Sequence, residues 1–333
     1  MIYILIPVFI VFFPPALFFL YLVLTEYKPK DVEETIRYRK TRDNTHYASY
    51  NIVSYNIGYC SNDKVSKKRN LNSKYSVKID SETVYDNLIV MTNILKDVDC
   101  DFSLLQEVDQ ASSRSGKIDQ VEHLTSDIKE MNSSFAYNYN AKYIPFPLNH
   151  PVGGTYSGLL TLSKFPAITS KRYQLEGHES FPKSLFYLKR CMLVEEYQLA
   201  KKKLIVINLH LSSFDKNNLF RTEQFHHMLR FIEKQYDGRK NAIIVGGDFN
   251  YLLNKDDLQM DTPDWLERLP EEFYDSKFKP VYPKTGHTML SDGKGYTIDG
   301  FLVSPNIKVQ HCKVIEDNFE HSNHNPVLMS FTV

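Results

Sequence analysis

The sequence predicts an α/β domain in which β-sheets pack face to face and helices cover their outer sides. One observation behind this prediction is that strand-like apolar runs outnumber the segments with helical spacing of apolar residues. The other is that the chain from about His46 to Val333 contains no proline-rich linker, repeat or low-complexity stretch that would divide it. Many strands and few helices in one uninterrupted domain indicate stacked sheets with helices outside.

The order of the elements supports this fold class. Strand-like runs alternate along the chain with segments of helical periodicity. Helices are expected over Val84–Leu95, Val121–Met131 and Phe225–Ile232. Strands are expected at Tyr50–Ile57, Phe102–Val108, Gly158–Ser163, Leu185–Tyr197, Leu204–Leu211, Ala242–Gly247, Thr297–Ser304 and Val327–Val333. Lys189 and Arg190, inside one of these runs, are expected on a solvated strand face.

The first 24 residues, MIYILIPVFIVFFPPALFFLYLVL, are apolar and carry no charged side chain. As a helix they would span roughly 35 Å at about 1.5 Å per residue, which is enough to cross a bilayer core. We therefore expect a single-pass transmembrane anchor over residues 1–24, a juxtamembrane stalk over 25–45 and one domain over 46–333. A cleaved signal peptide is the alternative, but a basic start and a small-residue cleavage site are not evident.

Composition limits the classes of partner. Of the 333 residues, 42% are hydrophobic and 40 basic residues balance 40 acidic ones. This composition excludes a disordered chain and a strong overall field that would recruit nucleic acid or an anionic membrane surface. The 4 cysteines lie far apart without a CxxC or Cys/His spacing, which argues against a zinc site and a disulfide framework.

Polar residues capable of chemistry gather at the ends of the expected strands. They are Asn56, Gln106, Glu107, His210, Asp248, Asn250, Asp299, Asn323 and His324. A buried charged group without a partner costs several kcal/mol, so these side chains are expected to converge on one another and on a cation.

Each motif also has a simpler interpretation when taken alone. GGDFN is compatible with a turn in which Asp248 caps its own backbone. Gln106 and Glu107 are compatible with solvated residues at a strand exit, and His210 with a hydrogen-bonded core histidine. The combination of six strand ends carries the functional inference.

The residue types define the chemistry. Carboxylates and carboxamides without cysteine form an oxygen-rich site that suits Mg²⁺, with Mn²⁺ as a second candidate, rather than zinc. Histidines beside such a cation can stabilise or protonate oxygens around phosphorus, while an aspartate deprotonates water. The sequence lacks a GxSxG motif, a glycine-rich phosphate loop and an activated Ser or Cys signature. Metal-assisted hydrolysis of a phosphate ester is the remaining reaction class.

The ordered motifs SYNIG, LLQEVD, INLHLS, VGGDFN, TIDGFLVS and SNHNPV resemble the endonuclease/exonuclease/phosphatase superfamily, whose fold is that of deoxyribonuclease I. The resemblance covers nearly everything from about residue 48 to the end. It implies a four-layer α/β sandwich, in which two mixed sheets pack together between helices. It also implies a Mg²⁺-dependent phosphoric ester hydrolase.

The resemblance assigns the metal-binding residues by position. Glu107 matches the principal Mg²⁺ ligand, and Asn56 matches a carboxamide near metal and phosphate. Asn323 stands where the family usually has aspartate, in the motif SDHxPV. This carboxamide removes one negative charge and one strong ligating oxygen, so weaker Mg²⁺ binding and a slower reaction are expected.

The resemblance also assigns the reacting groups. His210 matches a histidine that contacts the scissile phosphate, and Asp248 matches the residue that aligns or deprotonates the attacking water. Asn250 matches its phosphate-binding neighbour. Asp299 is similar to the carboxylate that orients the second histidine, which His324 matches.

Within the superfamily, the apolar start followed by TEYKP, the stretch EVDQASSRSGKIDQVEHL and YSGLLTLSKFP resemble membrane-anchored bacterial members. In that resemblance Arg114 and Tyr156 fall on loops near the strand ends, where they are candidates for contact with an anionic substrate. As surface residues they would need no such role.

Substrate and topology stay open at this level. A membrane-anchored nuclease is the first hypothesis, a lipid phosphodiesterase or phosphatase of sphingomyelinase or inositol-phosphate type is the second, and a non-catalytic phosphate-binding protein, suggested by Asn323, is the third. The basic residues after the apolar segment favour a cytoplasmic domain, whereas the family context favours a domain outside the cytoplasm, which is the orientation we expect.

Overall fold

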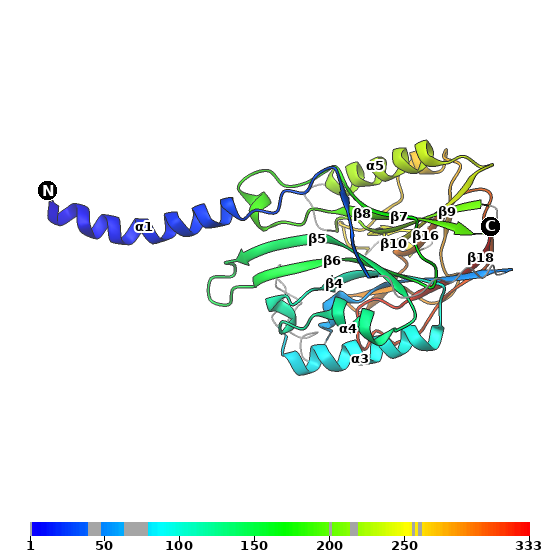
Figure 1. The fold of residues 1–333 in the computed structure, drawn as a ribbon, viewed down its shortest axis with the longest axis horizontal. Helices are drawn as coiled ribbons and strands as arrows, with labels where there is room; N and C mark the ends of the chain where they lie inside the picture. The colour runs from blue at the N-terminus through cyan, green and yellow to red at the C-terminus, as the bar shows by residue number, and fades with distance from the viewer. Residues whose placement is uncertain are drawn as a thin grey trace.

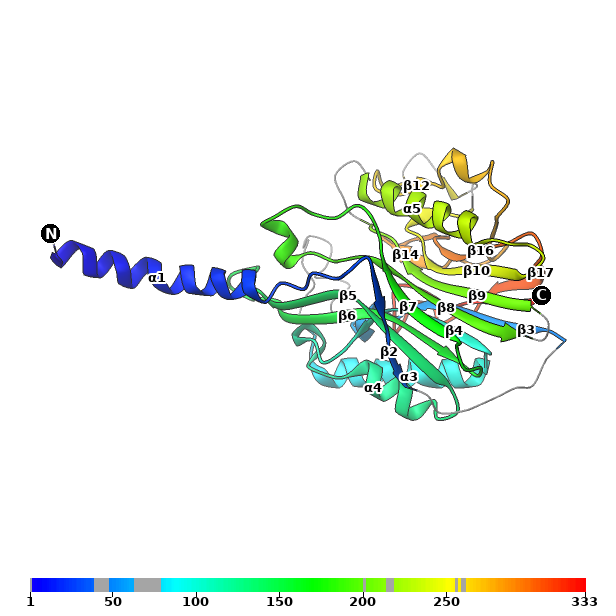
Figure 2. The same cartoon turned by 45° about the horizontal axis from the view of Figure 1, so that its top comes forward.

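Two seven-stranded sheets stacked on each other form the centre of the molecule (Figures 1 and 2). The computed structural model describes residues 2–38, 48–62, 79–199, 202–213, 219–254, 257–258 and 262–333, with side chains from residue 13 onward. The first sheet has the strand order β1 (Val32–Glu34), β7 (Thr169–Gln174), β8 (Cys191–Leu199), β9 (Lys202–His210), β10 (Asn241–Asp248), β16 (Asp299–Val303), β13 (Lys279–Val281). The second has the order β17 (Lys308–Val314), β18 (Val327–Thr332), β3 (Tyr50–Asn56), β4 (Phe102–Asp109), β6 (Gly153–Ser163), β5 (Asn132–Ile144), β2 (Ile36–Tyr38).

Helices cover the outer faces of both sheets. Figures 1 and 2 show α5 (Leu219–Gln235) on one side of the pair of sheets, with α3 (Ser81–Val98) and α4 (Gln120–Asp127) on the other. The start of α3 is fixed by Asp80, whose side chain accepts a hydrogen bond from the Thr83 backbone at 2.8 Å. Short pairs β11 (Tyr251–Leu252) with β12 (Glu267–Arg268) and β14 (Met289–Ser291) with β15 (Lys294–Tyr296) lie outside the main sheets. The expected α/β arrangement of two packed mixed sheets flanked by helices is confirmed.

Side-chain alternation along the strands creates three layers of apolar packing. On β9, Val206 faces the other sheet while the next residue, Ile207, packs under α5. On β4, Leu104 faces the other sheet and Leu105 packs under α3 and α4. Because successive side chains of a strand point to opposite faces, continuous apolar runs such as LIVI predict strands covered on both sides.

Some strands have no apolar signal in the sequence. The strand β5 reads NSSFAYNYNAKYI, and its Ser133 and Ser134 are nonetheless buried. Pairing with β6 on one edge and β2 on the other satisfies its backbone, so its strand character depends on its neighbours. The expected second helix is shorter than its apolar periodicity suggested, because α4 ends at Asp127 and Met131 leads into β5.

The N-terminal segment departs from the expected division into anchor and stalk. Residues Ile2–Leu24 form one helix, α1, which projects from one end of the sheets (Figure 1). Across the part of the chain that the structure describes, helices with both the length and the apolar character needed to span a bilayer are not found. Residues 1–12 of the expected anchor and 39–45 of the expected stalk lie outside the described side chains. Within the segment expected to be a stalk, β1 pairs with β7 and β2 pairs with β5, so residues 32–38 belong to the sheets.

Candidate active site

The candidate site lies where strands of both sheets end. On the first sheet, β9 ends at His210 and β10 at Asp248, and these two residues are direct partners in a parallel pair. The antiparallel strand β16 begins at Asp299, which is the partner of Asp248 on the other side. Strand pairing therefore places His210, Asp248 and Asp299 side by side although they are far apart in the sequence.

The second sheet contributes the facing side of the site. Asn56 is the last residue of β3, and Glu107 lies near the end of β4, where the register with β6 shifts between Leu105 and Val108. Glu107 has a backbone φ of 55°, which is unusual for a residue with a side chain and marks a bulge. The loop that carries His324 is tied to the end of β3, because Ser322 Oγ donates a hydrogen bond to the Asn56 carbonyl at 2.8 Å.

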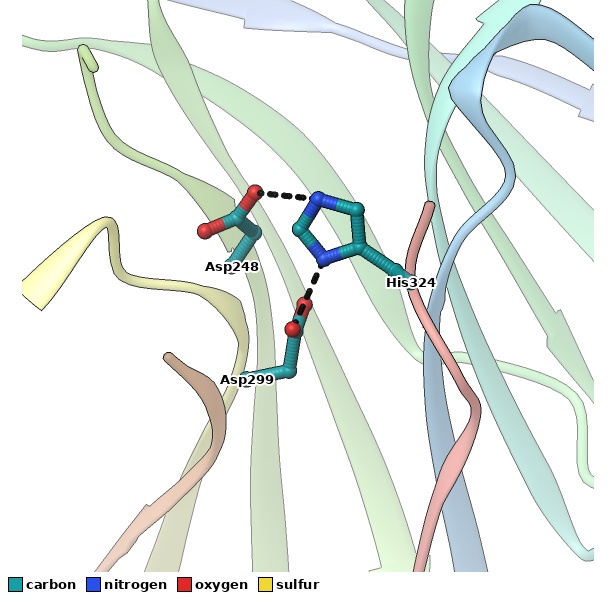
Figure 3. Close-up of side chains that lie close together, drawn as sticks. All are labelled: Asp248, Asp299 and His324. Atoms are coloured by element: carbon teal, nitrogen blue, oxygen red, sulfur yellow. Dashed lines mark hydrogen bonds and ion pairs between the residues drawn. The ribbon is translucent and has the colours of Figure 1, made fainter. Parts of the chain in front are cut away.

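His324 lies between two buried aspartates (Figure 3). Its Nδ1 is 2.8 Å from Asp299 Oδ2, and its Nε2 is 3.8 Å from Asp248 Oδ2. Burial by itself would lower the pKa of His324, but the charges of Asp299, Asp248 and Glu107 raise it to about 9. His324 is therefore an imidazolium at neutral pH.

Asp248 is held by hydrogen bonds on both oxygens. Asn56 Nδ2 donates to Oδ2 at 3.0 Å, and the Asn250 backbone N–H donates to Oδ1 at 2.9 Å. Burial and the nearby charge of Asp299 raise the pKa of Asp248 to about 6, even though His324 and these hydrogen bonds act in the opposite direction. A carboxylate with this pKa can accept a proton near neutral pH.

His210 differs electrostatically from His324. Its Nε2 is 3.4 Å from Asp248 Oδ2 and 3.9 Å from Glu107 Oε1. Burial, together with the positive charges of Arg190 and His324, holds the pKa of His210 well below its usual range. The two histidines thus have different protonation states, one neutral and one cationic.

These side chains open into a cleft of about 770 Å³. Its lining includes Asn56, Glu107, His210, Asp248, Asn250, Asn323 and His324. Asn323 is exposed at this cleft, whereas the neighbouring His324 is buried. Trp265, the single tryptophan of the chain, also lines the cleft.

The donor set fits a divalent cation. Ligand atoms of Asp248, Asp299 and His324 lie within 4.8 Å of one another, and because the protonated ring of His324 cannot ligate a cation, the carboxylate oxygens are the donors in this group. Asp299 Oδ1 is buried without a hydrogen-bond partner among the described residues, and the Glu107 side chain is 31% exposed. Open carboxylate oxygens together with carboxamides are the ligands that Mg²⁺ and Mn²⁺ prefer.

The two candidate substrate-binding residues lie outside the cleft lining. Arg114 is buried and forms a two-pronged contact with Asp109, at 2.8 and 3.0 Å, and its guanidinium stacks 3.8 Å from the Tyr59 ring centroid. Since its charge is already paired, Arg114 supports Tyr59, which does line the cleft. Tyr156 is half-buried and faces Lys142.

Arg190 is a cation near the site that sequence reasoning placed on a solvated face. The residue is 8% exposed, and its Nε is buried without a hydrogen-bond partner in the described part of the chain. Arg190 directly precedes β8, whose Met192 pairs with Leu209 on β9. Arg190 therefore lies at the edge of the sheet where β9 ends at His210. Burial lowers the pKa of Arg190, while the negative charges of Glu107 and Asp248 act against this. The sequence pattern placed Arg190 inside a strand expected over Leu185–Tyr197, whereas the strand begins only at Cys191, so its burial beside the site could not be predicted.

Comparisons with known proteins agree with this fold. A profile of the Endonuclease/Exonuclease/phosphatase family matches residues 53–324. A crystal structure of an endonuclease/exonuclease/phosphatase from Beutenbergia cavernae superposes with a TM-score of 0.61 at 16% identity, covering 86% of this chain and 72% of that one. D. rerio TDP2, humanized by 14 mutations, gives a TM-score of 0.56 at 16% identity, covering 86% of this chain and 100% of that one.

A structure of D. rerio TDP2 complexed with a single-strand DNA product gives a TM-score of 0.55 at 15% identity, again covering 86% of this chain and 100% of that one. The search of curated proteins returns no significant match. At these identities the solved structures show the shared fold, and the family profile shows the class. The chain belongs to the Endonuclease/Exonuclease/phosphatase family.

Proposed function

We propose that this protein is a divalent-metal-dependent phosphodiesterase that hydrolyses nucleic acid. Members of the family are hydrolases acting on phosphate esters and generally use divalent metals. The observation that carries the proposal is the position of Asp248 between His210, Asn56 and His324 at the base of an open cleft. This arrangement provides a base, a cation and two hydrogen-bonding groups for one phosphorus centre.

The reacting groups divide into a base and a cationic donor. Asp248, oriented by Asn56 and Asn250, accepts a proton from the attacking water. His324, held as an imidazolium by Asp299, donates a hydrogen bond or proton to a phosphoryl oxygen as its charge grows. Water thereby forms the new P–O bond, the bond between phosphorus and the ester oxygen breaks, and the ester oxygen leaves as an alcohol after it takes up a proton from solvent.

The remaining residues bind and orient the phosphate. Neutral His210 donates from its ring to a phosphoryl oxygen, and Arg190 provides a buried positive charge behind it. Glu107, Asn56 and Asn323 are the ligands proposed for the cation. When bound, Mg²⁺ supplies Lewis-acid stabilisation of the charge that develops on the phosphoryl oxygens.

A nucleic-acid substrate is favoured over a smaller one by the shape of the site. The cleft is open and is lined by two aromatic side chains, Tyr59 and Trp265, besides the polar groups. Aromatic side chains next to a phosphate site provide surfaces on which bases stack. The solved complex of a fold relative, TDP2, with a single-strand DNA product supports the same substrate class.

A lipid phosphodiester is the second candidate, and the N-terminal segment is the observation that favours it. Residues 1–24 carry no charge and form the helix α1 over Ile2–Leu24. We propose that this helix attaches the protein to the cell membrane in a single pass, with the domain outside the cytoplasm. Digestion by protease added to intact cells tests this topology: a fully protected domain would place it inside.

The experiment that tests the function uses the full chain, since residues 32–38 belong to the sheets. The purified protein is incubated with single-stranded DNA, RNA, sphingomyelin and phosphoinositides, with Mg²⁺, Mn²⁺ or EDTA. Cleavage of nucleic acid that requires the metal and is lost in Asp248→Asn supports the proposal. Release of a lipid headgroup without nucleic-acid cleavage would support the second candidate instead. Phosphate binding without turnover of any substrate would contradict both and indicate a non-catalytic binding protein.

A further inference from the structure

The segment that follows α1 contacts the stretch of chain that leads into Arg190. This segment, residues 26–33, is here called the N-terminal strap. Glu26 of the strap has a side chain that is 8% exposed, and it lies against Lys189, whose side chain is 11% exposed. The strap therefore contributes a buried charge to the domain rather than a solvated linker.

Glu26 makes two contacts with the stretch 184–190. Its Oε1 accepts a hydrogen bond from Ser184 Oγ at 2.9 Å and one from Lys189 Nζ at 3.3 Å. Burial alone would raise the pKa of Glu26, but the Ser184 hydrogen bond and the Lys189 charge bring it below its usual value. Glu26 is thus ionised at neutral pH and pairs with a buried ammonium group. Loss of one partner from such a pair leaves an uncompensated charge.

A second chain of contacts links the strap to the same stretch. Arg172, which is 2% exposed, donates from Nη2 to the Lys189 carbonyl at 2.8 Å. The guanidinium of Arg172 lies 5.7 Å from the ring centroid of Tyr27, and the Tyr27 hydroxyl donates to Glu33 at 2.9 Å. Both the side chain and the backbone of Lys189 are therefore held from the strap.

Arg190 follows Lys189 directly and depends on this support. Its carbonyl accepts hydrogen bonds from the Leu175 backbone at 3.0 Å and from Gln174 Nε2 at 3.1 Å. Its own Nε finds no partner among the residues that the structure describes. Arginine side chains have about 2 kcal/mol of rotamer entropy, so the backbone at residues 189–190 helps to decide where the buried charge of Arg190 lies.

We propose that Glu26 is a positioning residue for the active site: through Lys189 it holds the buried positive charge of Arg190 beside the end of β9 that carries His210, where this charge favours binding of a phosphate group in the cleft. The inference rests on the proposed function in that it takes the cleft to be a phosphate site. It gives the strap a role in substrate binding in addition to its position after α1. The ligand class that the strap controls is a phosphate ester or inorganic phosphate.

The test measures binding of radiolabelled inorganic phosphate to the full chain by equilibrium dialysis with Mg²⁺, which needs no turnover. Glu26→Gln is expected to weaken phosphate binding roughly fivefold, the scale of coupling between residues of one hydrogen-bond network. The matched control is Glu34→Gln, on the following strand β1, where the carboxylate is 76% exposed and 3.9 Å from Lys171. This control is expected to bind phosphate like the unmodified chain. Thermal unfolding midpoints are recorded for all variants, and dialysis is run well below them.

The outcomes separate this inference from the proposed function. Arg190→Met is measured in parallel, and an unchanged phosphate affinity in that variant would remove Arg190 from the proposed site. If Arg190→Met weakens binding but Glu26→Gln does not, the positioning role is wrong while the site stands. A lower unfolding midpoint for Glu26→Gln with unchanged phosphate affinity shows a purely structural pair and overturns the inference. Equal weakening in Glu26→Gln and Glu34→Gln would also overturn it, because the effect would then not depend on the contact between Glu26 and Lys189.

Discussion

The contact between Asp299 and His324 gives the sharpest test of the site. Both side chains are buried, at 1% and 6% exposure, and the oxygen and nitrogen are 2.8 Å apart. Asp299→Asn keeps the size of the side chain and a hydrogen-bond acceptor but removes the charge. We expect the imidazolium form of His324 to lose most of its stabilisation, because Asp299 is the largest source of the raised pKa.

The magnitude follows from the pKa of His324. A value of about 9 against an ordinary 6.5 corresponds to about 3 kcal/mol of differential interaction with the protein, at about 1.36 kcal/mol per pKa unit. If Asp299 supplies two thirds or more of that amount in the transition state, the loss is about 2–3 kcal/mol. This predicts that kcat falls roughly 30- to 150-fold at constant Mg²⁺.

The assay is hydrolysis of bis(p-nitrophenyl) phosphate by the full chain at saturating Mg²⁺, followed across pH. The matched control is Asp292→Asn, which removes a carboxylate from an exposed residue of the same cleft and should leave kcat within about twofold. A kcat for Asp299→Asn that is as close to the unmodified chain as the control would refute the assigned role of His324.

Asp299→Asn also changes how the stability of the protein depends on pH. Because the folded-state pKa of His324 is raised, its contribution to stability is complete below about pH 6.5 and is lost as pH rises towards 9. The difference in unfolding free energy between the unmodified chain and Asp299→Asn should therefore shrink over that interval. A difference that stays constant from pH 6 to pH 9 would mean that the pair does not titrate as described.

Three further predictions concern the metal, the core and the sheet. Asn323→Asp restores the usual carboxylate at the cleft and should lower the Mg²⁺ concentration for half-maximal activity by roughly tenfold, whereas an unchanged Mg²⁺ dependence would refute the interpretation of this position. Burial raises the pKa of Glu195, which accepts from the Tyr197 hydroxyl at 2.9 Å, so its favourable contribution is present at acid pH and is lost as pH rises. Glu195→Gln should therefore raise the unfolding midpoint more at pH 8 than at pH 5, and the reverse order would contradict this. Gly158→Ala places a Cβ 2.1 Å from the Ala136 carbonyl oxygen and should lower the free energy of unfolding by about 3 kcal/mol, measured by urea unfolding. A change below about 0.5 kcal/mol would show that the strands β5 and β6 can separate there.

Several features of the fold are readable from the sequence because they depend on local periodicity. The runs that became β3, β4, β9, β10 and β18 each contain a stretch of consecutive apolar residues, as expected for strands that are covered on both faces. The strand β5 was not predicted from the sequence, since its serines and asparagines are buried by pairing with β6 and β2 rather than by their own hydrophobicity. Residues 32–38 were not predicted as strands for the same reason, because they form strands by pairing with β7 and β5.

The polar residues show the same division. His210, Asp248, Asp299 and His324 could be chosen from the sequence because polar groups at the ends of apolar strands are costly unless they meet. Arg114 and Arg190 could not be assigned, because an arginine in the sequence does not reveal its partner. In the structure Arg114 pairs with Asp109, whereas the Nε of Arg190 is buried near Glu107 and has no hydrogen-bond partner among the described residues.

The sequence by itself determined the class of fold, the family motifs and the kinds of atom available to a cation, because these follow from residue types and their spacing. Only the tertiary structure decided the protonation states of His210 and His324 and the contact of the N-terminal strap with the stretch before Arg190. The physical reason is that burial and neighbouring charges set the pKa of a side chain, and contacts such as that of Lys189 with Glu26 fix its position. Both depend on segments that are distant in the sequence.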